Sequence, residues 1–211
     1  MTRAAVIVAH PDDETLWCGG AILSRPNWDW FILTLCRASD PDRRARFGQT
    51  LKYLGVDGAM ADLDDGPKQL PLDPSAVRHV IRESLPRSAY DVVFTHGPMG
   101  EYTRHLRHEE CCRAVVSLWT DRQLEVGRMM LFAYDDQAGA RLPRAKTNAD
   151  ESLALDAETL SRKRHIITNI YGFDQQSWEA RTTPEVEAFN VFTERSQAEH
   201  LQFTAPGVER Q

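Results

Sequence analysis

Apolar runs of strand length alternate with segments of helical periodicity along most of the chain. Strands are predicted at residues 4–9, 30–36, 59–63, 91–95 and 129–134. Helices are predicted at residues 14–23, 42–54, 74–85, 109–119 and 160–170. Alternating strands and helices indicate βαβ units and a mainly parallel sheet, and strands that are apolar throughout indicate a sheet buried on both faces. We therefore expect an α/β fold with helices on both faces of the sheet.

Several residues mark where these elements begin and end. Gly55 follows the helix at 42–54 and predicts its C-terminal stop, and Asp73 is expected to cap the N-terminus of the helix at 74–85. Residues 135–150 are small, polar and basic, which is typical of a long loop. The residues beyond 203 are expected to form a loose tail.

The length of 211 residues suits one domain, which we expect to span residues 1–211. A net charge of −6 argues against general binding to nucleic acids or anionic membranes, which favour a basic face. No apolar run approaches the roughly 18 residues that a bilayer-spanning helix needs, and the first residues lack the regions of a signal peptide. We therefore expect a cytoplasmic protein with neither nucleic acid nor membrane as a partner; a homo-oligomer is compatible with this composition.

The chain has four cysteines and no CxxC pair, so no zinc knuckle is predicted. Cys18, Cys36, Cys111 and Cys112 are interpreted as small buried side chains, as free cysteines commonly are. This cysteine usage indicates a reducing compartment.

Two clusters of metal-ligating residue types follow predicted strands, where open α/β sheets bind their ligands. The first is His10-Pro11-Asp12-Asp13-Glu14. His10 and Asp13 are three residues apart across a turn, so an imidazole nitrogen and a carboxylate oxygen can reach one ion. The alternative is an ordinary helix N-terminus, which favours proline and acids in its first turn. That alternative explains the acids but not His10.

The second cluster begins at His96, at the end of the strand 91–95, and continues to His105 and His108. The last two are spaced i,i+3 at the start of a helix and can share one face. A polar loop with solvated histidines is the alternative, but two such clusters at one sheet edge favour a metal site. His96 is a candidate for lining the pocket, although a strand-end histidine bonded to backbone is the more ordinary interpretation.

Two further groups lie near these clusters. Trp17 is the tryptophan expected to approach the site, since it follows the first cluster closely. Asp62, Asp64 and Asp65 follow the third predicted strand, and an acidic loop is the ordinary interpretation of them.

The residues Val8-Ala9-His10-Pro11-Asp12-Asp13-Glu14 resemble the signature of the LmbE/PIG-L family of zinc-dependent N-acetylglucosamine deacetylases. The segment Gly100-Glu101-Tyr102 with His105-x-x-His108 is similar to the family's second motif, usually His-Pro-Asp-His. Lys163, Tyr171 and Gln176 resemble a weaker terminal motif. The resemblance implies a Rossmann-like fold.

The resemblance also implies a site and a reaction. It implies His10, Asp13 and His108 as metal ligands, Asp12 as general base, and His105 as the residue that stabilises the oxyanion or protonates the product. The implied metal is zinc, and Fe(II) accepts the same donors. The implied substrate is a small N-acetylglucosamine-type sugar or conjugate, which would yield acetate and a free amine.

The chain departs from the family pattern in three places. Leu106-Arg107 replaces the usual Pro-Asp, so His105 lacks the carboxylate that normally supports it, and an arginine nearby would favour neutral imidazole. Arg44 matches an Arg-x-x-Glu pair, but Phe47 replaces its glutamate. Tyr102 lies one position before a tyrosine that some members use. Arg44, Tyr102 and His96 are therefore the candidates for substrate binding.

Two other functions fit the same residues. One is a metal-dependent amidohydrolase or esterase acting on a non-sugar acyl substrate. The other is a non-catalytic Rossmann-like binding protein with a vestigial metal site, for which the change at Arg107 is the main argument.

Overall fold

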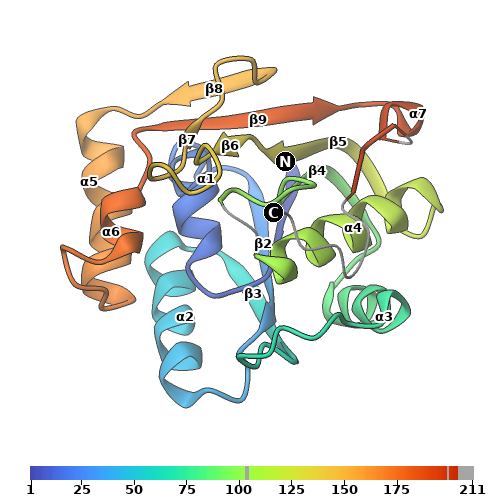
Figure 1. Ribbon diagram of the computed structural model, residues 1–211, viewed down its shortest axis with the longest axis horizontal. Coiled ribbons are helices and arrows are strands. Elements are labelled where there is room, and N and C mark those ends of the chain that lie inside the picture. Colours follow the sequence, from blue (N-terminus) through green and yellow to red (C-terminus); the bar gives the residue numbers. More distant parts are fainter. Residues whose placement is uncertain (103–104, 199, 204–211) are drawn as a thin grey trace.

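A twisted sheet forms the centre of the molecule in the computed structural model, which describes residues 1–102, 105–198 and 200–203. In this part of the chain seven strands form one sheet in the order β3-β2-β1-β4-β5-β9-β8 (Figure 1). Their bounds are Arg3–Val8 (β1), Asp29–Cys36 (β2), Asp57–Leu63 (β3), Ala89–Thr95 (β4), Glu125–Phe132 (β5), Glu151–Ala154 (β8) and Val186–Phe192 (β9). The first five strands pair in parallel, while β9 is antiparallel to β5 and β8 is antiparallel to β9. The predicted α/β fold with a mainly parallel sheet is confirmed.

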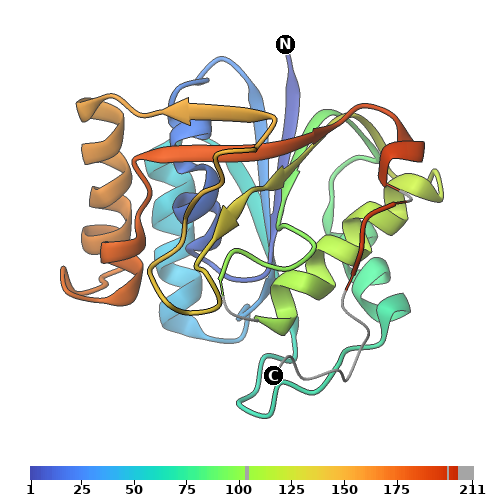
Figure 2. The same cartoon turned by 45° about the horizontal axis from the view of Figure 1, so that its top comes forward.

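Helices cover both faces of this sheet. Their bounds are Asp13–Leu23 (α1), Pro41–Leu54 (α2), Pro74–Ser84 (α3), Leu106–Thr120 (α4), Ala157–His165 (α5), Trp178–Thr182 (α6) and Arg195–Ala198 (α7). Helices α1, α2 and α5 lie on one side, and α3, α4 and α7 lie on the other (Figures 1 and 2). A hydrophobic core lies on each face of the sheet, and alternate residues of β1 pack into the two cores. Val6 and Val8 pack into one core, and Ala5 and Ile7 pack into the other. This burial on both faces explains why β1 is apolar from Ala4 to Val8.

Two of the predicted helix ends are found where the sequence placed them. Gly55 ends α2 in the left-handed conformation, with φ of 71°. The side chain of Asp73 caps α3 by accepting from the backbone N–H of Ser75. At the start of α2, Asp40 accepts from the N–H groups of Asp42 and Arg43, so this helix begins one residue before the predicted position.

The two antiparallel strands at one edge of the sheet were not predicted. Strand β9 contains Glu187, which is fully buried although it is an acid, and β8 is a short, mostly exposed edge strand. Residues 135–150, predicted as a loop, contribute to a small two-stranded ladder of Tyr134–Asp135 (β6) with Arg144–Ala145 (β7). The helix predicted at 160–170 is α5 followed by one π-helical turn, η1 (Ile166–Ile170). The predicted loose tail lies outside the described residues.

A buried ion pair connects this edge to the first helix. The ammonium of Lys163 lies 2.7 Å from Glu187 Oε1, and both side chains are fully buried. The same carboxylate accepts from the N–H groups of Gly20 and Ala21, at 2.6 and 2.8 Å. These donors follow Cys18, where α1 departs from helical angles. Glu187 thus satisfies backbone N–H groups at the kink and fixes β9 against α1.

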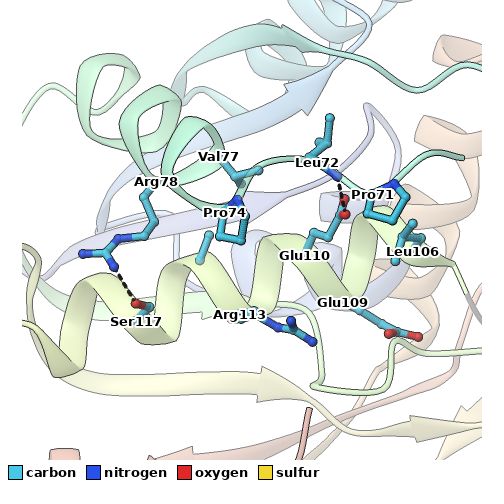
Figure 3. A pocket seen from close by; sticks show the side chains of 11 residues that line it. Pro71, Leu72, Pro74, Val77, Arg78, Leu106, Glu109, Glu110, Arg113 and Ser117 are labelled. Carbon is cyan, nitrogen blue, oxygen red and sulfur yellow. Dashed lines mark hydrogen bonds between the residues drawn. The ribbon is translucent and has the colours of Figure 1, made fainter. Parts of the chain in front are cut away.

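A second connection joins the loop before α3 to α4. A cavity of about 210 Å³ lies between α3 and α4, and apolar side chains such as Val77 and Leu106 line much of it. Across it the backbone N–H of Leu72 donates to Glu110, and Arg78 donates to Ser117 (Figure 3). The loop that follows β3 is therefore attached to the helix that carries His108.

Two expectations from composition can be compared with the structure. All four cysteines are unpaired and buried, as predicted. Within the described residues, no helix has the length and apolar character needed to cross a membrane.

Candidate metal centre and catalytic pocket

The two predicted clusters meet at the carboxyl ends of β1 and β4. These strands are neighbours in the sheet, with Ile7 opposite Thr95, but the helices that follow them cover opposite faces. The strand order therefore changes direction here, which is where open α/β sheets bind their ligands. His10 follows β1 and His96 follows β4, so chain topology brings the two segments together.

Three potential ligand atoms lie almost equally far from one another. His10 Nδ1 lies 3.2 Å from Asp13 Oδ2 and 3.4 Å from His108 Nε2, and Asp13 Oδ2 lies 3.3 Å from His108 Nε2. Four-coordinate zinc with bonds of about 2.0–2.2 Å separates its ligand atoms by about 3.3–3.6 Å. These residues therefore fit one tetrahedrally coordinated ion.

Other groupings of donors overlap with this one. His10, His105 and His108 also form a compact group, as do Asp13, His96 and His108. In the second group, however, His96 Nε2 accepts a hydrogen bond from the backbone N–H of Ala9 at 3.0 Å. Its lone pair is already occupied, which makes His96 a poor metal ligand. His96 is fully buried and does not line the pocket, so it has the backbone-bonded position of the ordinary interpretation rather than a substrate contact.

Asp13 is the central acid of the site. Burial opposes its ionisation, but His108 and His96 hold the pKa of this carboxyl well below its usual range. Its second oxygen, Oδ1, accepts from the indole N–H of Trp17 at 3.0 Å. Trp17 does approach the site, as predicted, but it is fully buried and lies behind the acid.

Asp12 lies in the pocket in an unusual backbone conformation. Its φ of 121° lies in a region that residues with a side chain rarely adopt. The Asp12 N–H donates to Glu14 Oε2 at 2.9 Å, and Glu14 Oε1 in turn accepts from the Tyr171 hydroxyl at 2.8 Å. Burial, followed by the charge of Asp13, raises the pKa of Asp12 well above its ordinary value, and Arg43 lies 3.6 Å away.

His105 borders the pocket as a neutral imidazole. Burial, followed by His108 and His10, lowers the pKa of His105 to about 3. Its Nδ1 atom is buried and has no hydrogen-bond partner among the described residues. Arg107 occupies the position of the aspartate expected from the resemblance, and in the described part of the chain no carboxylate hydrogen-bonds to His105 Nδ1.

The structure corrects the expected role of Arg107. Its guanidinium turns to the loop after β3, donating to the backbone oxygens of Asp64 and Leu70 at 2.6 and 2.8 Å and to the carboxylate of Glu110. The neutral state of His105 therefore comes from burial and neighbouring histidines. Arg107 instead holds the loop that carries Asp65.

Asp65 faces the outer nitrogen of His10. Its Oδ1 atom lies 3.4 Å from His10 Nε2, and Oδ2 accepts from Arg37 at 3.0 Å. Although burial opposes ionisation, contact with His10 and Arg37 holds the pKa of Asp65 well below its usual range. The sequence indicated only an acidic loop here.

The pocket in front of these residues has a volume of about 440 Å³. Its lining includes His10, Asp12, Asp13, Arg37, Arg43, Asp65, Tyr102, His105, Trp178 and Glu179. The rings of Tyr102 and Trp178 lie 4.6 Å apart in an edge-to-face contact. Trp178 and Glu179 come from α6 and were missed, although Gln176 of the weaker terminal motif lies two residues before Trp178.

Arg44, expected at the substrate, is exposed and does not line the pocket, whereas Arg43 does. The two arginines differ because they lie on different faces of α2. Arg43 lies one helical turn before the buried Phe47 and shares its face, while Arg44 is turned by about 100° toward solvent.

The sequence of this chain is similar to that of a known protein family. Residues 5–119 match the model of the PIG-L family, described as GlcNAc-PI de-N-acetylase. A comparison with curated proteins finds no match.

Several solved structures have a similar fold. An N,N'-diacetylchitobiose deacetylase from Pyrococcus horikoshii shares 15% identity over 91% of this chain and 84% of its own, with a TM-score of 0.65. A conserved protein from Thermus thermophilus shares 18% identity over 100% of both chains, with a TM-score of 0.62. A 4-carboxy-2-hydroxymuconate hydratase from Pseudomonas putida shares 17% identity over 86% of this chain and 83% of its own, with a TM-score of 0.59.

At these identities the similarity to solved structures concerns the fold. The family model adds information on the sequence itself, because its span of residues 5–119 is more than half of the chain and includes both histidine clusters. This chain therefore belongs to the PIG-L family.

Proposed function

We propose that this protein is a metal-dependent N-deacetylase acting on an N-acetylglucosamine-type sugar or sugar conjugate. Membership of the PIG-L family supports an N-deacetylase, and deacetylases are among the proteins of similar fold. The observation that carries the proposal is the triangle of His10 Nδ1, Asp13 Oδ2 and His108 Nε2, with sides of 3.2–3.4 Å, beside Asp12 in an open pocket.

His10, Asp13 and His108 would hold one divalent ion. Zinc suits two imidazoles and a carboxylate, and Fe(II) accepts the same donors. When bound, the metal would polarise the acetamide carbonyl and lower the pKa of a water molecule in the site. The remaining steps depend on side chains of this chain.

Asp12 is the proposed general base. Its carboxylate lines the pocket beside Asp13, and its bond to Glu14 fixes the backbone that presents it. As water adds to the carbonyl carbon, Asp12 accepts a proton from that water. The C–N bond then breaks, and the proton passes to the leaving nitrogen, so that acetate and a free amine result.

His105 is proposed to act on the oxygen of the reacting carbonyl. As a neutral imidazole it has one N–H to donate, and a donor at that position offsets the negative charge that develops during addition. His105 borders the same pocket as Asp12, so both can reach one acetamide group.

Arg43 and Tyr102 are proposed as substrate contacts. Both line the pocket, and Arg43 approaches Asp12 without contacting the proposed ligands. Their guanidinium and hydroxyl groups suit the hydroxyls of a sugar.

The test combines metal content with acetate release. Purified protein should contain about one divalent ion per chain and release acetate from N-acetylglucosamine conjugates. Asp12→Ala should keep the metal and lose activity by about 10²-fold or more, whereas His10→Ala and His108→Ala should lose the metal. Protein that binds no metal, or an Asp12→Ala variant with near wild-type activity, would overturn the proposal.

The substrate panel should also include non-sugar acetamides and acetate esters. Faster acetate release from these compounds than from sugar conjugates would identify an amidohydrolase or esterase of another class. Metal binding without any acyl hydrolysis would fit the non-catalytic alternative, and either result would reject the sugar deacetylase.

A further inference from the structure

Glu101 lies at the meeting point of three hydrogen-bond donors. Its side chain is completely buried in the segment between β4 and α4. Oε1 accepts from the backbone N–H of Gly97 at 2.8 Å, while Oε2 lies 2.8 Å from His96 Nδ1 and 2.7 Å from His108 Nδ1. The two imidazole rings stack with centroids 3.9 Å apart, so one oxygen reaches both.

The hydrogen bond that His96 accepts determines which atoms donate in the bonds between Glu101 and the two imidazoles. Its Nε2 accepts the N–H of Ala9, so the ring proton must be on Nδ1, and Glu101 must be the acceptor there. The same oxygen has a second lone pair for the Nδ1–H of His108. The neutral form of His108 with its proton on Nδ1 has its unprotonated Nε2 directed toward Asp13 and His10.

Glu101 also influences the position of His10, through His96 and the backbone of Ala9. The imidazole that Glu101 holds accepts from Ala9, the residue immediately before His10. Since the backbone N–H of His10 is bonded to Asp13 Oδ2 at 2.9 Å, the orientation of this short segment is fixed on both sides. Glu101 therefore influences both histidines of the proposed metal site, one directly and one through the backbone.

The surroundings leave the carboxylate little freedom to move. A side chain at Gly97 would place its Cβ 2.7 Å from the backbone oxygen of Phe132, so only glycine fits where the backbone donates to Glu101. This close approach holds the β4 end against the neighbouring strand. The acceptor oxygens are therefore held by backbone as well as by imidazole.

We propose that Glu101 is the positioning residue of the metal site, which sets the Nδ1–H tautomer of both His96 and His108 and thereby aims His108 Nε2 at the ion. Hydrogen bonds to the outer nitrogen of a ligating histidine orient the ring and raise its basicity, and their loss typically weakens metal affinity by about 10–100-fold. The metal in this inference rests on the proposed function, whereas the tautomers do not.

The first experiment measures the tautomers by ¹⁵N NMR of histidine side chains in the metal-free wild-type protein. Both His96 and His108 should carry their proton on Nδ1. A ring with a proton on Nε2 and none on Nδ1 would overturn the inference without bearing on deacetylation. The measurement needs no variant and therefore does not depend on whether one folds.

The second experiment uses Glu101→Gln, which keeps shape but replaces one acceptor oxygen by an NH₂ donor. Three donors then face one oxygen, so either Gly97 or the two imidazoles lose their acceptor. Zinc affinity, measured by competition with a chromogenic chelator, should fall about 10–100-fold. Affinity within about twofold of wild type, in folded protein with unchanged tautomers, would overturn the inference.

Glu187→Gln is the matched control. Glu187 is also fully buried and also accepts two backbone N–H groups, but its third partner is Lys163 instead of histidine. This variant should lose stability while zinc affinity and histidine tautomers stay as in wild type. An equal loss of zinc affinity in both variants would assign the effect to general destabilisation and overturn the inference. Wild-type protein with the stated tautomers but no zinc binding would instead reject the proposed function.

Discussion

Replacing Arg107 by methionine tests how strongly α4 is tied to the loop after β3. The arginine side chain is only 2% exposed, and it donates to two backbone oxygens and to Glu110. Methionine retains most of the aliphatic part of the side chain, so the main loss is the guanidinium group with its charge and its N–H donors. The two carbonyls and the Glu110 carboxylate, itself 14% exposed, would then lack their donor.

The expected cost is about 3 kcal/mol in the free energy of unfolding. Removing one partner of a buried ion pair costs about 3–5 kcal/mol, and we expect the lower end because Glu110 keeps some contact with water. Urea denaturation followed by circular dichroism measures this directly. At a typical slope of about 1–3 kcal/mol per molar, the midpoint should fall by at least about 1 M.

A double variant identifies the source of the loss. Glu110→Gln keeps an acceptor for the Leu72 N–H but removes the charge, so Arg107→Met with Glu110→Gln leaves no unpaired carboxylate. The two changes together should cost less than the sum of the single changes, by about 0.5–3 kcal/mol. Strict additivity, or a loss below about 1 kcal/mol for Arg107→Met alone, would refute the reasoning.

Three other substitutions give separate tests. Asp65→Asn removes the charge that faces His10 Nε2 and should weaken zinc binding by about tenfold or more; unchanged affinity in chelator competition would show that Asp65 does not orient His10. Lys163→Met leaves Glu187 buried without its cation and should lower the free energy of unfolding by about 3–5 kcal/mol, and a change below about 1 kcal/mol in chemical denaturation would contradict this. Gly172→Ala places a Cβ against the guanidinium of Arg46 at a φ of +75°, so thermal unfolding should show a loss of about 1–3 kcal/mol. Wild-type stability would mean that this turn relaxes freely.

The parallel half of the sheet was predictable because its strands are buried on both faces. In β1 and β4 nearly every residue is apolar, and the runs stand out without reference to any partner. The antiparallel edge gave no such signal. Glu187 interrupts the apolar run of β9, and its burial depends on Lys163, which lies in another element. Only the assembled structure explains why an acid is buried there.

The candidate site, too, was predictable from the sequence only in part. His10 and Asp13 were grouped from residue type and from their place after a strand, and the family resemblance singled out His108 within the second histidine cluster. Glu101 was part of a recognised motif, yet its contact with two imidazoles depends on how the loop folds back. The choice between Arg43 and Arg44 turned on one residue of helix register, which sequence spacing did not resolve.

The far wall of the pocket is supplied by a late part of the chain. Trp178 and Glu179 belong to α6, outside the residues that match the family model, whereas the histidine clusters lie inside them. Replacement of this short helix can therefore alter which molecules fit, while the groups proposed to carry out hydrolysis come from other elements. Relatives that differ in this helix are therefore expected to differ in the ligands they accept, and exchanging α6 segments between them would test this.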